Sequence, residues 1–311
     1  MSLLPFLILG TTALLLHLGL TVAAAPLVAR LSEYLSGLFA GADPVPADLS
    51  RTTLIAAAMR PWRTIRDLME KEPVRAGNAS PLSGASPLLS LALTLSAAWL
   101  VPSFATGMLT GSFADLATIL ALLAAARVVL LLGAFDAGMA LPGSAASSAS
   151  VGLLLAMPGS ALALFVLYSA TGSTSLDHLL PGLHAGAGVL PALCLALAAL
   201  AAGGEDTELS DPLSGPDLAL FRLQSSLQIV IWIDLVTALL VPETLTIAQS
   251  GPLSWLLGLM FWAMRLVTGC VVLAALKSSV ATVPARRRLA GLSVLLGVLA
   301  PLLLLVGSSG E

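Results

Sequence analysis

The sequence predicts an all-α, polytopic transmembrane helical bundle of about eight spans, built as a single integral membrane domain over residues 1–311. Three observations predict this fold class: 58% of the residues are hydrophobic, only 10% are charged, and the mean hydropathy is +0.99. A soluble domain is about one quarter charged. Because a water-soluble fold could not bury so much apolar surface, the expected solvent is a lipid bilayer.

Eight apolar runs are long enough to cross a membrane, since about 20 helical residues match a hydrocarbon core of about 30 Å. The runs are continuous rather than alternating, which favours helices over barrel strands. The first run is too long for a cleaved signal peptide and lacks a basic n-region, so we expect it to remain as a span. The predicted spans are Leu3 to Ala29, Pro87 to Leu109, Phe113 to Ala134, Val151 to Ala170, Leu183 to Ala202, Leu218 to Val241, Leu253 to Leu276 and Leu289 to Val306.

The positions of the 14 Lys and Arg residues predict the orientation of the bundle. All but three of them fall in the first or the last loop, and these two loops lie on the same side when the chain crosses eight times. The exceptions, Arg127, Arg222 and Arg265, lie within spans or at their edges. The positive-inside rule therefore predicts a multi-pass protein of the cell inner membrane, with both termini on the non-cytoplasmic side.

The long first loop, residues 30–86, is predicted to be cytoplasmic and to contain an amphipathic helix. Apolar residues recur every three or four positions from Leu54 to Met69, with charged residues between them. We expect this helix to lie at the membrane surface, with an interruption around Pro61, and to bind either lipid headgroups or a soluble partner. Its mixed charge favours a protein partner, and the predicted docking residues are Trp62, Arg63, Arg66, Asp67, Lys71 and Glu72.

Ionisable residues inside the spans are costly in lipid, so each is a candidate functional residue. Asp234 in the sixth run and Arg265 in the seventh are predicted to lie near the middle of the bilayer, within reach of each other or of a bridging water. They form either a structural ion pair or part of a proton path. His17 is either a hydrogen-bonded packing residue or a proton carrier, and Arg127, near the cytoplasmic end of its span, can snorkel to the surface.

The sequence contains no motif of a self-contained active site. It has no P-loop, dinucleotide-binding glycine motif, zinc-protease motif or nucleophile elbow. Neither the two cysteines nor the outer-loop group of Asp177, His178 and His184 has the spacing of a metal site, so no metal is expected. The net charge of -3 does not favour nucleic acid. These features favour a channel, a carrier or a membrane module of a larger assembly.

Three segments of the chain carry a family resemblance. Residues 60–74 read RPWRTIRDLMEKEPV, residues 126–138 begin with AR and end in GAFDAG, and residues 214–220 read SGPDLAL. In the same order, they resemble the QPYRDLxKLLxKEPV, AR…GLDTGSPF and SGPDLA segments in the membrane subunit of group 4 membrane-bound NiFe hydrogenases, formate hydrogenlyase subunit 4. That family is homologous to the quinone-site membrane subunit, subunit 1, of respiratory complex I, the NADH-quinone oxidoreductase.

The resemblance implies a membrane-anchor subunit of a complex-I-like hydrogenase or oxidoreductase, without a cofactor of its own. The expected partners are soluble hydrogenase or quinone-reductase subunits that carry iron–sulfur clusters and a NiFe centre, antiporter-like membrane subunits, and membrane lipid. Electron transfer in such complexes is linked to proton or sodium movement. The resulting path candidates are Asp136, Glu205, Asp206, Glu208, Asp211, Asp217, Asp234 and Arg265, with Arg127 and Arg222 setting the local potential.

The chain departs from the family pattern in two places. In the acidic loop, residues 203–217, Asp211 leads almost directly to Ser214, as if a stretch were deleted, and residues 143–147 read GSAAS where the family has GASRE. Both changes remove charge from the expected proton route, so anchoring is better supported than proton transfer. Two alternatives remain: a quinone-binding membrane subunit of NADH-quinone oxidoreductase, and a standalone polytopic transporter.

Overall fold

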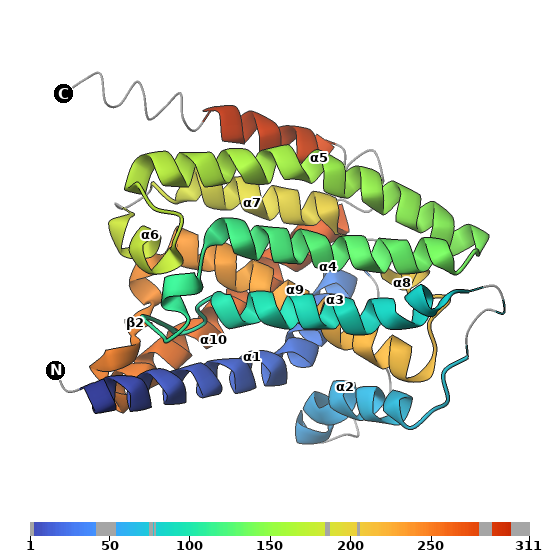
Figure 1. Cartoon of the computed structure of the whole chain (residues 1–311), viewed down its shortest axis with the longest axis horizontal. Helices are drawn as coiled ribbons and strands as arrows, with labels where there is room; N and C mark the ends of the chain where they lie inside the picture. Colours follow the sequence, from blue (N-terminus) through green and yellow to red (C-terminus); the bar gives the residue numbers. More distant parts are fainter. Residues whose placement is uncertain are drawn as a thin grey trace.

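The computed structural model describes residues 3–41, 54–74, 77, 79–183, 187–203, 206–279 and 288–299. Within this part of the chain, six helices are long and apolar enough to cross a membrane. Figure 1 shows them running along the longest axis of the molecule. They are α1 (Leu3–Phe39), α3 (Pro81–Leu100), α4 (Leu116–Asp136), α5 (Ala140–Thr171), α9 (Gly215–Leu240) and α10 (Pro252–Ser279). The prediction of an all-α, multi-pass membrane protein is confirmed.

Two of the eight predicted runs form shorter helices. The run from Leu183 to Ala202 contributes only the 14 residues of α7 (Val189–Ala202), and α6 (Leu176–Gly182) is a separate helix before it. A helix of this length rises about 21 Å, less than the hydrocarbon core. The last run is described only as the helix Arg288–Leu299, and its residues 300–306 lie outside the described part. Six crossings are therefore supported directly, and the count of eight remains a prediction.

The predicted amphipathic helix is α2 (Leu54–Met69), which lies outside the bundle near one of its ends (Figure 1). The helix continues through Pro61, so the predicted interruption there is wrong. A single proline removes only one backbone hydrogen bond, and the amphipathic pattern on both sides keeps the helix on the bundle surface. Ile65 is buried, while Arg63 and Arg66 face outward.

The two ends of the bundle differ in structure. The end formed by α2, α8 (Asp206–Leu209) and the first turns of α3 and α9 is called the loop end here. At the opposite, strand end, β1 (Ala105–Thr106) pairs in parallel with β2 (Thr246–Ile247) and ties the loop after α3 to the loop after α9. Short 3-10 turns complete these loops: η2 (Gly111–Phe113), η3 (Pro242–Thr244) and η4 (Ala248–Ser250).

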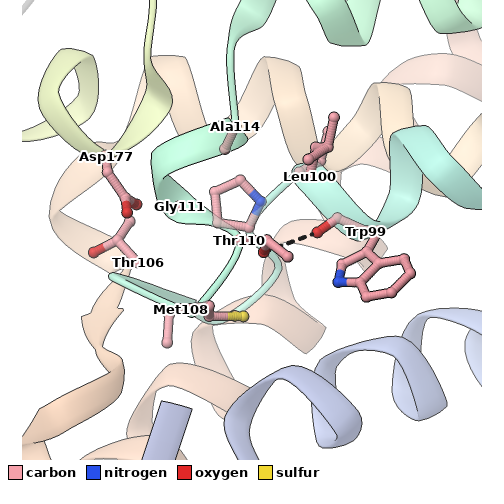
Figure 2. A pocket seen from close by; sticks show the side chains of 11 residues that line it. Trp99, Leu100, Thr106, Met108, Thr110, Gly111, Ala114 and Asp177 are labelled. Carbon is pink, nitrogen blue, oxygen red and sulfur yellow. Dashed lines mark hydrogen bonds between the residues drawn. The ribbon is translucent and has the colours of Figure 1, made fainter. Parts of the chain in front are cut away.

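A small pocket of about 240 Å³ opens at the strand end, between the loop after α3 and α6 (Figure 2). Asp177 of α6 accepts a hydrogen bond from the backbone N–H of Gly107 at 3.0 Å. The Thr110 hydroxyl donates to the carbonyl of Trp99 at 3.2 Å. The only carboxylate that lines this pocket therefore holds the loop after α3 in place, which is a structural role.

Close helix contacts are made at small residues. A Cβ atom at Gly133 of α4 would clash with the Ser86 side chain of α3, and one at Gly269 of α10 would clash with Ile233 of α9. In lipid the hydrophobic effect does not press helices together, so such close backbone approach supplies much of the packing energy. These contacts fix α3 against α4 and α9 against α10, four of the helices that carry the buried polar residues described next.

Candidate buried polar site

Helix α3 ends at Leu100, and the four residues that follow, 101–104, form irregular backbone that is almost fully buried. Ser103 and Phe104 are 0% exposed. Because lipid offers no hydrogen bonds, irregular backbone at membrane depth needs partners from the protein itself. Donors on neighbouring helices supply them.

His17 of α1 is the first of these partners. Its Nε2 lies 2.8 Å from the carbonyl of Ala98, and its Nδ1 lies 2.6 Å from the hydroxyl of Ser103. A carbonyl oxygen only accepts, so Nε2 carries a proton, and in the neutral ring Nδ1 accepts from the Ser103 hydroxyl. His17 is 1% exposed. The histidine therefore joins α1 to the end of α3 through both ring nitrogens.

Arg265 of α10 is the second partner. Its Nη2 donates to the carbonyl of Ser103, beyond the C-terminal end of α3, where the helix dipole favours a positive charge. The side chain is only 4% exposed. Among the described residues, its Nε and Nη1 groups have no hydrogen-bond partner. A buried guanidinium thus keeps two donors that the described part of the protein does not satisfy.

Asp234 of α9 lies in the same buried region and is 1% exposed. One of its oxygens, Oδ1, accepts a hydrogen bond from the Trp262 indole at 2.9 Å. Trp262 precedes Arg265 by three residues, so both project from one face of α10. Within the described part of the chain, Asp234 and Arg265 form no direct ion pair. The carboxylate and the guanidinium share one site without touching.

A stripe of hydroxyl side chains on α3 was not anticipated from the sequence. Ser83, Ser86, Ser90 and Thr94 recur every three or four residues, which places them on one helix face, and all four are buried. Gln224 of α9 is 0% exposed and donates its Nε2 to the Thr94 hydroxyl at 3.1 Å. The Oε1 of Gln224 has no partner among the described residues. The sequence signal was the helical spacing of hydroxyls inside an apolar run.

The predicted path residues do not all converge on this site. Asp136 at the end of α4 accepts from the backbone N–H groups of Ser80 at 2.9 Å and Ser83 at 3.0 Å, so it caps α3. Asp217 is buried in the first turn of α9. The side chains of Glu208, Asp211 and Arg222 are exposed. Glu205 and the side chain of Asp206 lie outside the described residues.

Arg127 of α4 lies inside the bundle rather than at a membrane surface. Its position near the end of an apolar run would allow it to snorkel, but the side chain is only 4% exposed and does not do so. Arg127 is followed by nine further residues of α4, which amounts to about 14 Å of helix. Dense packing of α3 and α5 on α4 encloses this part of the helix. Arg127 is therefore a second buried cation within the bundle.

The predicted docking residues lie at the loop end. Their exposed members are Arg63, Arg66, Asp67, Lys71 and Glu72. Trp62 differs from these five, since it is half-buried and its Nε1 donates to the carbonyl of Ala23 in α1 at 3.2 Å. The indole holds α2 on the bundle, and the charged residues face outward, where they can meet solvent or a partner.

The segment after α2 is also tied to the start of α9. Ser214 accepts from the N–H of Val74 at 2.6 Å and donates to its carbonyl at 3.0 Å. The next residue, Gly215, has a φ of +55°, and a Cβ there would lie 2.9 Å from the carbonyl oxygens of Lys71 and Glu72. Glycine is required here on two counts, the backbone conformation and the close approach.

A Gly215→Val variant is therefore expected to be less stable, by about 1–3 kcal/mol in the free energy of unfolding. The strain and the clash act together at the junction of α2 and α9. Unfolding in mixed detergent micelles measures the change. Gly143→Ala is the matched control, because a Cβ at that helical glycine meets nothing within 4 Å; equal stability of the two variants would contradict the assignment.

No protein-family model and no curated protein sequence matches this chain. Its fold is similar to a chain in the structure of the membrane-bound sulfane sulfur reductase, an archaeal respiratory membrane complex, with a TM-score of 0.58 and 14% sequence identity. The similarity covers 91% of this chain and 99% of that chain. Fold and buried site together define a multi-pass, all-α membrane protein with the fold of a chain from a respiratory membrane complex. The similarity supports this class of membrane protein and does not identify the hydrogenase family in particular.

Proposed function

We propose that this chain is the membrane-anchor subunit of a complex-I-like respiratory oxidoreductase. The observation that carries the proposal is the fold similarity, which extends over nearly the whole of this chain and of a chain from a respiratory membrane complex. The three hydrogenase-like segments add to this argument, because two of them, residues 60–74 and 214–220, meet at the loop end through Ser214 and Val74.

The loop end is the proposed docking surface for a soluble electron-transfer arm that carries iron–sulfur clusters. Exposed basic and acidic residues alternate on α2 and after it, and Arg66 pairs with Glu70 at 3.6 Å. Such mixed charge suits a protein partner better than an anionic lipid surface. Antiporter-like membrane subunits would pack against the lipid-facing helices. The chain itself would hold no cofactor.

Reversal of two charges tests the docking surface. An Arg63→Glu, Arg66→Glu double variant should retain less than about one tenth of the soluble subunits on purification, because like charges at a rim both slow and weaken association. Retention is measured by quantitative mass spectrometry of the detergent-purified complex. Arg288→Glu is the control, since Arg288 is also exposed but lies on another helix. Full retention by the double variant would rule out this surface.

We further propose that the anchor links electron transfer to proton movement, with Asp234 as its central residue. A carboxylate that is 1% exposed and has a neutral donor as its direct partner can exist with or without its proton. Arg265, and Arg127 on α4, set the electrostatic potential of the region. A charge change in the docked arm would alter the proton occupancy of this site. Electron transfer in the arm would in this way drive the uptake or release of a proton in the membrane.

A further inference from the structure

We propose that the buried side chains of Ser83, Ser86, Ser90, Thr94 and Gln224 line a column of water that conducts protons from the loop end to the cluster of His17, Asp234 and Arg265. The column contains no carboxylate along its length. The inference rests on the proposed function for its driving reaction, but its residues are different from the acidic ones that the family resemblance named.

The stripe on α3 has the length and direction that such a column needs. From Ser83 to Thr94 the helix rises about 16 Å, which is roughly half of a hydrocarbon core. Asp136 lies at the foot of the stripe, where its carboxylate accepts from the N–H of Ser83. All four hydroxyl residues of the stripe are buried by protein and none faces lipid.

Hydrogen bonds connect the stripe to the helices around it. The Ser90 hydroxyl donates to the carbonyl of Ala126 in α4 at 2.8 Å, and the Thr94 hydroxyl donates to the carbonyl of Ser90 at 2.8 Å. Gln224 then takes over from α3, because its Nε2 donates both to Thr94 and to Gln228 one turn further along α9, at 3.0 Å. Polar groups of α3, α4 and α9 thus follow one another from Ser90 to Gln228.

Unsatisfied polar atoms mark where water belongs. Among the described residues, Gln224 Oε1 and the Nε and Nη1 groups of Arg265 are buried without a partner. Gln224 contacts Thr94, and the cluster that contains Arg265 begins at Ala98, whose carbonyl His17 binds. Thr94 and Ala98 are about 6 Å apart along α3. Buried polar atoms of this kind are normally satisfied by ordered water.

The chemistry of the column is a proton relay. Each hydroxyl or water accepts a proton on one side and releases another on the opposite side, so one proton enters, one leaves, and only the orientation of the hydrogen bonds changes. Rotation of the groups restores the starting state, and no oxidant or reductant is consumed. His17 and Asp234 exchange protons with it at the far end.

Proton flux through the purified complex in liposomes tests the column. A potassium gradient with valinomycin drives the flux, and pyranine trapped inside reports it. Gln224→Leu and Thr94→Val should slow the flux at least about tenfold, because apolar side chains leave the water without partners. Thr94→Ser keeps the hydroxyl and should retain the flux. Ser96→Ala is the matched control, since Ser96 is exposed and bonds only to the backbone of its own helix.

The outcomes separate this inference from the proposed function. Wild-type flux in both Gln224→Leu and Thr94→Val, with normal elution profiles, would overturn the column and leave the anchor role standing. A wild-type complex no more conductive than protein-free liposomes would overturn it as well. Absence of soluble subunits from the wild-type preparation would instead contradict the anchor role. Slow flux in the two apolar variants, with soluble subunits still bound, supports both.

Discussion

An Asp234→Asn variant is expected to lose ion coupling and to keep its assembly. Asparagine retains an oxygen that can accept from the Trp262 indole, so the hydrogen bond observed at 2.9 Å can persist. It cannot take up or release a proton at neutral pH. Because Asp234 forms no direct ion pair among the described residues, its neutralisation should disturb packing little. Proton pumping, measured with a pH-sensitive dye in vesicles that contain the intact complex, should fall to background while subunit composition stays unchanged.

Glu243→Gln is the control for this variant. Glu243 is exposed in η3 at the strand end, so the same loss of one carboxylate there should leave pumping unaffected. Normal pumping in Asp234→Asn would remove Asp234 from any proton path. It would then favour the purely structural interpretation of the buried polar site.

An Arg265→Met variant is expected to be strongly destabilised. The change removes the donor to the Ser103 carbonyl and the positive charge near the buried Asp234. A buried carbonyl that loses its donor costs about 1–3 kcal/mol. The free energy of unfolding in mixed micelles should fall by that order, and the loop after α3 should become accessible to protease. Arg222→Met should change little, because Arg222 is exposed.

A double variant shows which contact Arg265 serves. Since the guanidinium and the Asp234 carboxylate do not touch, adding Asp234→Asn to Arg265→Met should recover only a small part of the lost stability. Full recovery would mean that charge pairing, and not support of the irregular backbone after α3, is the main role of Arg265. The coupling free energy of the pair is the quantity to compare.

Hydropathy was enough to predict the fold class and most of the spans. Six of the eight runs correspond to long apolar helices, because crossing a bilayer demands length and apolarity and little else. Boundaries were less well predicted. The second run was expected to reach Leu109, but α3 ends at Leu100. The predicted run was too long because the buried segment after α3 is apolar too. Pro102 was the available signal, since a proline disfavours helix in the residue before it.

The polar interior was predicted only in part. Asp234, Arg265 and His17 stood out because an ionisable residue is conspicuous in an apolar run. The hydroxyl stripe on α3 and the role of Gln224 were not predicted. Hydropathy averaged over a window records how apolar a segment is, and it does not record which helix face the polar residues share. The place of Arg127 in its run left snorkelling open, but helix packing decides whether an arginine reaches water, and packing is a property of the whole bundle.

The composition of the particle that contains this chain tests the central claim most directly. The chain, tagged and purified in mild detergent from the cells that naturally make it, should elute as one large assembly with soluble subunits. The absorbance and electron paramagnetic resonance of iron–sulfur clusters should follow the same peak, and native mass spectrometry should give one copy of this chain for each soluble arm. Elution of the chain alone or as a homo-oligomer, free of clusters, would contradict the account and favour a standalone transporter.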